Sequence, residues 1–487
     1  MNPTTLLIIL PLVAGAALLF IKTPLAKTIA LGVALLQLAI TAYAYYFAEL
    51  TPQAQFVTNI PWVESLGISY YVGMDGISLL LVMLTNFLLP LIILSSFRKT
   101  FEKPNVFYGL MLIMQSALVG VFVARDAFLF YIFWELALIP VYFICLLWGG
   151  ENRNKITFKF FIYTLVGSLI MLIGIIYLFL KTDGSSFAYE AFVNLSLSST
   201  EQTFLFWAFF LAFAIKMPVF PFHTWQPDTY TNAPAQGTML LSGIMLKMGI
   251  YGVIRWMIPV LPDAMYYWGT VAIFLSITGI VYASVIAIMQ KDFKRLIAYS
   301  SIAHVGLISA GIFTGTIEGL QGAIIQMLSH GLCAVGLFFI VDILYDRMNT
   351  HEIEKLGGIR NVAPQFALYF AIVMLGSVSL PLTSGFVGEY MLFVGVFKFN
   401  PWSAAVAGLT IILGAVYMLN AYKKIMLGET KPETSRFNDL YLTEKIVLIA
   451  VSFFILYMGI YPKTFLELSE PAAQSLIEVA MQNLSVR

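Results

Sequence analysis

Charged residues are scarce in this chain. Only 11% of its 487 residues are Asp, Glu, Lys or Arg, whereas 60% are hydrophobic, and the mean hydropathy is +0.87. This composition excludes an ordinary soluble globular protein. We expect a polytopic membrane protein that lies in a lipid bilayer. Nothing in the sequence indicates a nucleic-acid partner.

Cysteine is nearly absent as well. Cys145 and Cys333 lie far apart within apolar runs and lack CxxC or Cys/His ligand spacing, so neither a disulfide framework nor a metal or iron–sulfur site is indicated. The chain also lacks a P-loop and a GxGxxG motif after a strand. We therefore expect no cofactor or metal in this chain, and a driving force that comes from an ion gradient or from a partner.

Long apolar runs, in contrast, fill the sequence. A hydrocarbon core of about 30 Å requires about 20 apolar residues per helix, which predicts about fourteen transmembrane helices. The expected fold class is therefore an all-α polytopic membrane protein. The approximate spans are 4–21, 26–47, 74–97, 107–124, 127–148, 157–181, 202–221, 235–257, 267–290, 296–314, 320–345, 365–398, 402–422 and 443–461.

The basic residues predict the orientation of these spans. Nineteen of the 27 lysines and arginines, among them Lys294 in the ninth loop, fall in the first, third, fifth, ninth, eleventh and thirteenth loops, whereas the even loops hold only four, including Arg255. Cytoplasmic loops carry the excess of basic residues in membrane proteins. This asymmetry indicates an even number of spans, with both termini on the periplasmic side.

Two predicted spans contain helix-breaking residues. Pro218 and Pro221 follow directly after Lys216, and Pro381 interrupts the run 365–398. Irregular backbone at membrane depth is tolerated only where protein or a water-filled cavity surrounds it. Paired discontinuous helices mark the ion or substrate site in many transporters. A lysine beside such a break indicates an ion path, although a lysine that snorkels to the interface from a helix end is the simpler alternative.

The two breaks occur at similar depths in two successive groups of five spans. Consecutive groups of five start from opposite sides of the membrane, which is typical of inverted repeats. Chance coincidence of two proline-containing helices is the alternative. The predicted organisation is a three-helix segment at 1–106, a first repeat at 107–257 with its broken helix at 202–233, a second repeat at 267–426 with its broken helix at 365–398, and a C-terminal helix with a short tail at 443–487.

Four ionisable residues are predicted at membrane depth: Glu135, Lys216, Lys247 and Glu389. A charged side chain in a span costs roughly 2.5 to 3.5 kcal/mol on insertion scales, so each should face a partner or water. Glu135 and Lys216 are candidate partners. Burial disfavours the charged form of each residue and pairing restores it, so a pair that opens and closes would act as a gated proton relay.

Histidines are the further relay candidates. His304 and His330 lie in the tenth and eleventh spans, and His223 lies between the prolines of the first break. An imidazole with a pKa near 6.5 can pass protons along a hydrogen-bonded chain, but a single buried histidine is as often a packing residue. Asp75 precedes the third span and is interpreted first as a helix cap.

Several long motifs resemble one known family. The chain resembles the antiporter-like membrane subunits of respiratory complex I, and among them the subunit M type of bacterial NADH:quinone oxidoreductase, which is related to Mrp antiporter subunits. The motifs that carry the resemblance are Gly73-Met-Asp-Gly-Ile-Ser, Phe133-Trp-Glu, Lys216-Met-Pro-Val-Phe-Pro-Phe-His-Thr-Trp-Gln-Pro-Asp, Lys291-Asp-Phe-Lys-Arg-Leu-Ile-Ala-Tyr-Ser-Ser-Ile-Ala-His and Ser384-Gly-Phe-Val-Gly-Glu.

The resemblance implies fourteen helices, inverted repeats and a hydrated axis of charged residues along the middle of the membrane. In this family pattern Glu135 would be the glutamate of the fifth helix, Lys216 its partner, Lys247 the connecting lysine and Glu389 the terminal proton-exchange residue. His304 and His330 would bridge the halves. Sister subunits of the family carry lysine where this chain has Glu389, so the acid favours the M type.

The role implied by the resemblance is proton pumping coupled to NADH oxidation and quinone reduction. FMN, iron–sulfur clusters and quinone would belong to partner subunits, membrane and peripheral, of a complex in the bacterial inner membrane. Two alternatives remain. The chain could belong to a multi-subunit cation/proton antiporter or a membrane-bound hydrogenase, or it could be a structural spacer of an energy-converting complex.

Overall fold

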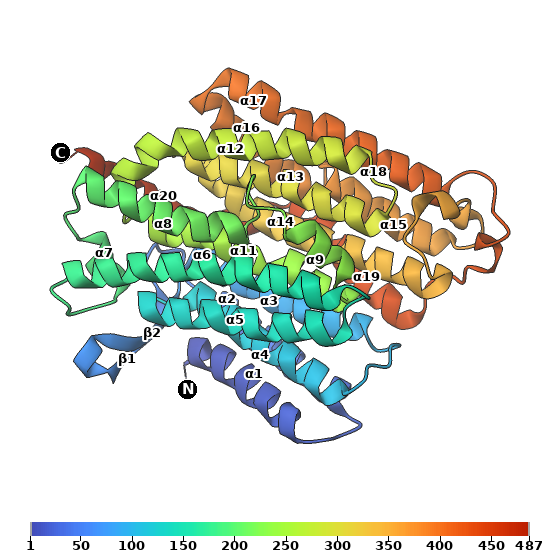
Figure 1. The fold of residues 1–487 in the computed structure, drawn as a ribbon, viewed down its shortest axis with the longest axis horizontal. Coiled ribbons are helices and arrows are strands. Elements are labelled where there is room, and N and C mark those ends of the chain that lie inside the picture. The colour runs from blue at the N-terminus through green and yellow to red at the C-terminus, as the bar shows by residue number, and fades with distance from the viewer. Residues whose placement is uncertain (1, 486–487) are drawn as a thin grey trace.

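The computed structural model, which describes residues 2–485, is a bundle of long helices that run side by side (Figure 1). Within that range, twelve helices are long and apolar enough to cross a membrane. They are α1 (Pro3–Phe20), α2 (Ala26–Tyr46), α3 (Gly76–Ser95), α4 (Pro104–Val123), α5 (Ala127–Trp148), α6 (Arg153–Lys181), the span Ala235–Met257, α12 (Pro262–Ile288), α13 (Phe293–Phe313), α14 (Ile317–Met348), the span Pro401–Met426 and α19 (Leu442–Ile460).

Two of these spans are composite. The span Ala235–Met257 alternates between α-helix and π-helix: α10 (Ala235–Leu240), η2 (Leu241–Met245), α11 (Lys247–Gly252) and η3 (Val253–Met257). Single π-helical turns inside α-helices occur often at functional sites. The span Pro401–Met426 comprises α17 (Pro401–Ala407) and α18 (Leu409–Met426).

The two predicted helix breaks are confirmed. The first separates α8 (Ser199–Lys216) from α9 (Gln226–Asn232), and the second separates α15 (Pro364–Ser377) from α16 (Ser384–Phe399). Proline removes a backbone donor and clashes with the preceding turn, so the helices end close to Pro218 and Pro381. These two broken elements lie where two further spans are predicted, and the total of fourteen spans stays a prediction. The inverted relation between the halves stays a prediction.

A small hairpin interrupts the otherwise all-α fold. Strands β1 (Gln55–Val63) and β2 (Ile68–Met74) pair antiparallel through the turn η1 (Glu64–Leu66) and Gly67, whose φ of 63° favours glycine. The short helix α7 (Tyr189–Val193) and the C-terminal helix lie at the same end of the bundle, on the left in Figure 1. We name this the hairpin end. The opposite end carries the turns η4 (Ile353–Lys355), η5 (Ile359–Asn361) and η6 (Thr434–Arg436).

The segment after α19 differs from the prediction. Instead of a short tail, it forms the 23-residue helix α20 (Lys463–Ser485). Its apolar residues face the bundle and pack on α3, α12 and α14, while charged residues face outward. A search for apolar spans misses such an amphipathic helix, because only one of its faces is hydrophobic. The buried positions are Phe465, Leu468, Ala472, Ala473 and Leu476.

Burial divides the bundle into central and peripheral helices. The apolar windows of α14 and of the span Ala235–Met257 are buried entirely, and that of α13 is 94% buried. In α1, α2 and α18 only about a third of the window or less is buried. Lys247, His304 and His330 lie on these central helices and are therefore surrounded by protein.

Gly76 tests the docking of α20 on the bundle. A Cβ atom at Gly76 would lie 1.7 Å from the carbonyl oxygen of Leu468, whereas a Cβ at Gly32 in α2 would meet no atom within 4 Å. We expect Gly76→Ala to displace α20 and to cost roughly 1 to 3 kcal/mol, as overpacking does. Gly32→Ala should leave stability unchanged or slightly raise it. Thermal unfolding and limited proteolysis of the purified protein in its complex would measure this, and equal behaviour of the two variants would contradict the close approach.

Candidate functional site

Lys216 ends the first half of the first broken helix. A capping box between Ser198 and Glu201 starts α8, and the helix ends at Lys216, just before Pro218. The side chain is 2% exposed, and its Nζ has no hydrogen-bond partner among the described residues. Nζ lies 5.2 Å from the ring centroid of Trp134, a favourable cation–π contact. The lysine also lies in the last helical turn, where a cation interacts favourably with the helix dipole.

Glu135 and Lys216 are predicted partners, but they form no ion pair among the described contacts. Glu135 lies on α5 and is partly exposed, and its buried Oε1 has no hydrogen-bond partner in the described chain. Within the described part of the chain no ion pair joins the two residues, although the Glu135 carboxylate is near enough to attract the Lys216 ammonium. The reason is local: the ring of Trp134, the residue before Glu135, lies under the ammonium. The structure therefore holds the pair open.

Lys247 lies in the centre of the bundle and is fully buried. It is the first residue of α11, directly after the π-helical segment η2. Its Nζ donates a hydrogen bond to the carbonyl oxygen of Ser242 at 2.7 Å and lies 3.0 Å from Nδ1 of His330. With Lys247 protonated, Nδ1 of His330 is the acceptor. The other ring nitrogen, Nε2, then carries the proton and donates to Oγ of Ser301, 3.0 Å away.

The second histidine connects this pair to the predicted exit residue. Nδ1 of His304 on α13 lies 2.9 Å from Oε1 of Glu389 on α16. The ring centroids of His304 and His330 are 6.2 Å apart. Lys247, His330, His304 and Glu389 therefore follow one another through α11, α14, α13 and α16, with hydrogen bonds within each pair and a gap between the two imidazoles.

A small cavity with several polar side chains in its lining adjoins both histidines. Its volume is about 20 Å³, and its lining includes Ser301, Gln326 and Ser329. Oε1 of Gln326 is buried and has no protein partner in the described residues. A buried cavity holds a water molecule when it offers about 10 to 15 Å³ and two or more polar partners. The space beside His304 and His330 meets both conditions, so one water molecule fits next to the two imidazoles.

Close helix packing brings Lys216 near the start of this succession. Gly249 lies against the end of α8, where a Cβ atom would come within 2.8 Å of the Phe213 carbonyl oxygen and 3.2 Å of the Lys216 Cβ. Only glycine permits this approach. No direct hydrogen bond joins Lys216 to Lys247 among the described contacts.

His223 is placed apart from the other candidates. It lies in the 217–225 interruption, and its ring contacts Phe220 and Tyr282, with centroids 5.6 Å and 5.1 Å away. Its Nδ1 has no hydrogen-bond partner within the described chain. The structure does not bring His223 together with Lys247, His330 or Glu389 through any described contact, and its relay role stays a prediction.

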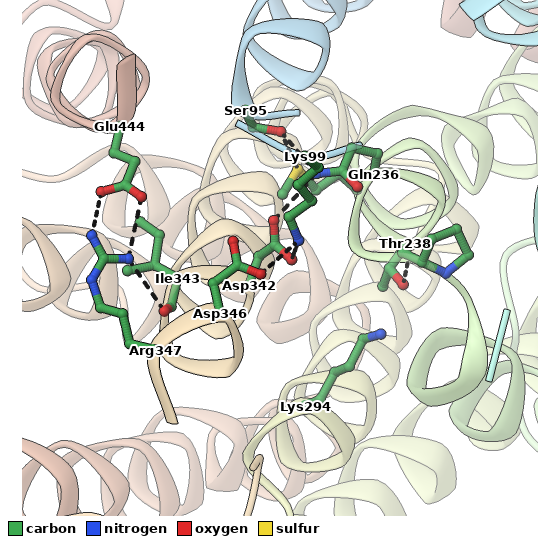
Figure 2. A network of polar contacts seen from close by, with 12 residues as sticks. Ser95, Lys99, Gln236, Thr238, Lys294, Asp342, Ile343, Asp346, Arg347 and Glu444 are labelled. Carbon is green, nitrogen blue, oxygen red and sulfur yellow. Dashed lines mark hydrogen bonds and ion pairs between the residues drawn. The ribbon is translucent and has the colours of Figure 1, made fainter. Parts of the chain in front are cut away.

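The sequence did not predict a charged network that lies at the end of the bundle opposite the hairpin end. Figure 2 shows Lys99 bonded to Asp342, with Asp346 at 3.2 Å and Nε2 of Gln236 donating to Asp342 at 3.2 Å. Burial alone would lower the pKa of Lys99, but the two carboxylates outweigh it and hold this pKa above its usual value. The network ties α3, α10 and α14 together.

Lys294 also lies elsewhere than predicted. It was counted among the loop residues, but it is buried in the first turn of α13. Its Nζ donates to the carbonyl oxygens of Thr231 at 3.1 Å and Ala233 at 2.7 Å, at the end of α9. Lysine commonly satisfies the free carbonyls at a helix C-terminus, so Lys294 fixes α9 to the second half of the chain.

A second unpredicted ion pair lies at the hairpin end. Asp75 caps α3 through a capping box with Ser78, as expected, but it also pairs with Arg255 of η3. Burial alone would raise the pKa of the Asp75 carboxyl. Arg255, the Ser78 amide and Arg125 outweigh burial and hold this pKa below its usual value. The spacing of Lys247 and Arg255, eight residues apart on one helical face, was the available sequence signal.

The fold and this polar succession define a class of protein: multi-span membrane subunits in which paired broken helices flank a line of buried ionisable residues. Comparisons with known proteins identify the family. Residues 124–414 match the family described as NADH:quinone oxidoreductase/Mrp antiporter, and residues 6–124 match the amino terminus of NADH-ubiquinone oxidoreductase chain 4. The chain belongs to the subunit M (chain 4) family of NADH:quinone oxidoreductase membrane subunits.

Individual relatives cover most of the chain. It is 42% identical over 432 residues to NADH-quinone oxidoreductase subunit M of Rickettsia conorii, which covers 88% of each chain. Identity to the subunit M of Rhodobacter capsulatus is 38% over 98% of this chain and 96% of the relative. The structure of respiratory complex I from Thermus thermophilus contains a chain with a TM-score of 0.92 and 31% identity, covering 98% of this chain and 99% of that one.

The contact between Lys247 and His330 gives a direct prediction. His330→Phe removes both ring nitrogens and leaves the Lys247 ammonium with one described acceptor, so proton pumping by the assembled complex should fall severely. His351→Phe is the control, because His351 stacks on Tyr345 away from the axis. Proton uptake in proteoliposomes driven by NADH measures the effect. Equal pumping by the two variants would remove His330 from the path.

Proposed function

We propose that this chain is a proton-translocating membrane subunit of NADH:quinone oxidoreductase. The observation that carries the proposal is the succession Lys247, His330, His304 and Glu389, whose polar contacts are 3.0 Å and 2.9 Å long. Each of these groups can both accept and release a proton. Membership of the subunit M family supports the same role.

The open pair of Glu135 and Lys216 provides the gate. An ammonium in a buried site is stabilised when a carboxylate approaches and destabilised when it withdraws. In the open state Lys216 lies beside Trp134 without a hydrogen-bond acceptor. A signal from a neighbouring subunit that moves Glu135 would therefore change the proton affinity of Lys216 and send its proton towards Lys247.

Glu389 is the exchange group at the far end of the succession. It is 2% exposed, and His304 is its described hydrogen-bond partner. A proton that arrives through His330 and His304 would reach this carboxylate and leave towards the hairpin end. The distribution of basic residues supports a periplasmic hairpin end in a bacterial inner membrane.

Redox chemistry would take place outside this chain. NADH oxidation and quinone reduction, with FMN and iron–sulfur clusters, would belong to partner subunits of the complex, membrane and peripheral. This chain would be part of the translocase without a redox centre of its own. Large apolar side chains such as Phe158, Ile173 and Phe274 remain exposed on its outer helices and would face lipid or those partners.

Two alternative functions are less well supported. A cation/proton antiporter or hydrogenase subunit shares this fold, but the acid at Glu389 and the named relatives favour subunit M. A structural spacer would not need Lys216, Lys247 and Glu389 in the bundle interior, where each costs insertion energy.

The gate predicts the effect of neutralising Glu135. Glu135→Gln keeps the shape of the side chain but removes its charge, so Lys216 can no longer be stabilised by closing of the pair. We expect normal assembly with NADH oxidation and proton pumping both sharply reduced in proteoliposomes.

Glu151→Gln is the matched control, because Glu151 is exposed in the loop after α5. Normal pumping by the Glu135 variant in a normally assembled complex would mean that the chain is scaffold or uses another path.

A further inference from the structure

A polar stripe leads from Lys247 away from the proposed path. Lys247, Tyr251 and Arg255 follow one another at intervals of four residues in the span Ala235–Met257. Residues spaced by four lie on one helix face, and eight residues rise about 12 Å along the axis. The stripe therefore runs from Lys247 to the hairpin end of the bundle.

Each hydrogen bond along this stripe is donated in the same order, from Arg255 to Tyr251 and from Tyr251 to a backbone carbonyl. The hydroxyl of Tyr251 donates to the carbonyl oxygen of Phe122 at 2.7 Å, and Nε of Arg255 donates to the Tyr251 oxygen at 3.1 Å. The only Tyr251 proton is thus used on a backbone carbonyl, which cannot pass it further. In this arrangement the stripe offers Lys247 no relay that both accepts and releases a proton.

Arg255 stands at the inner end of a cleft. The cleft has a volume of about 250 Å³, and its lining includes Asp75, Arg125, Tyr189, Glu190 and Arg255. Glu190 is 48% exposed at the mouth and pairs with Arg125 at 2.7 Å, whereas the side chain of Arg255 is only 5% exposed. Solvent at the hairpin end can therefore approach the line of ionisable residues up to Arg255.

A guanidinium group at this point opposes proton passage. Arginine stays protonated at any physiological pH, so it cannot take a proton from either side. A fixed cation also repels hydronium, which is how arginine excludes protons from water-filled pores. Asp75 lowers the cost of burying this cation, since a paired buried charge is far less costly than a lone one.

We propose that Arg255, held by Asp75, is an electrostatic barrier to protons between Lys247 and the cleft at the hairpin end. The barrier prevents Lys247 from exchanging protons directly with the cleft, so that its proton passes to His330. This role rests on the proposed proton-translocating function. The alternative is that the ion pair only ties η3 to the start of α3.

The double variant Arg255→Gln/Asp75→Asn tests the barrier. It removes both charges together, so no unpaired buried charge remains, and asparagine preserves the cap of α3. The assembled complex is placed in proteoliposomes without NADH, and the decay of an imposed pH gradient is followed with a pH-sensitive dye. We expect the gradient to decay several-fold faster than with the unmodified complex.

The matched control is Arg347→Gln/Glu444→Gln. This pair, shown in Figure 2, is also buried, at 2.6 Å with both side chains 8% exposed. It lies near η6 at the end of the bundle opposite the hairpin end. The control should stay as tight as the unmodified complex. Equal leak rates in the two double variants, whether low or high, would overturn the proposal.

A titratable variant tests the same charge without removing its partner. Arg255→His keeps a cation at low pH next to Asp75, Arg125, Glu190, Tyr189 and Tyr251, the groups that face this position. Imidazole, unlike guanidinium, loses its charge as the pH rises through its pKa, so the passive leak should rise with pH in this variant alone. A leak equal to that of the unmodified complex at every pH would overturn the barrier.

The passive leak tests the barrier, and NADH-driven pumping tests the proposed gate, so either proposal can be contradicted without the other. Normal pumping by Glu135→Gln in a normally assembled complex would contradict the proposed gate and the path that starts from it, whatever the leak rates are. If Arg255→Gln/Asp75→Asn shows no added proton leak while Glu135→Gln loses pumping, only the barrier proposal is contradicted.

Discussion

The cost of placing ionisable groups among buried helices is the constraint on which this structure depends. A charge removed from water must be paired, solvated by dipoles or neutralised. The chain uses a different solution for each of three buried cations: the Trp134 ring for Lys216, a backbone carbonyl and His330 for Lys247, and Asp75 for Arg255. Only the pairing of Arg255 with Asp75 fixes the charge permanently. The other two solutions leave a proton free to move.

Irregular backbone makes these solutions possible. The breaks around Pro218 and Pro381 and the π-helical turns beside Lys247 expose backbone groups inside the bundle, where a regular helix would use all of them. Gly249 then allows α11 to approach the end of α8. Local departures from ideal helix geometry therefore coincide with the residues that are proposed to transfer protons.

The sequence predicted the spans and the breaks well, because hydropathy and proline act locally. It could not predict which side chains meet. Glu135 and Lys216 form no ion pair in the described structure, where the Lys216 ammonium lies over the Trp134 ring, and the pair that opens and closes stays a prediction. Lys294 and Arg255 were counted as loop residues because the counting of basic residues ignores burial, and α20 was missed because only one of its faces is apolar. The His304–Glu389 bond joins residues far apart in the chain, so only the folded structure reveals it.

Lys247 is the point through which both halves of the proposed path must pass. The most direct test compares Lys247→Met with Lys247→Arg in the assembled complex, by counting the protons pumped for each NADH oxidised. Arginine keeps the charge but cannot release a proton at physiological pH. Loss of pumping in both variants, with assembly intact, is the predicted result, because transfer and not charge alone is required. An unchanged proton count in the arginine variant would contradict proton transfer through Lys247.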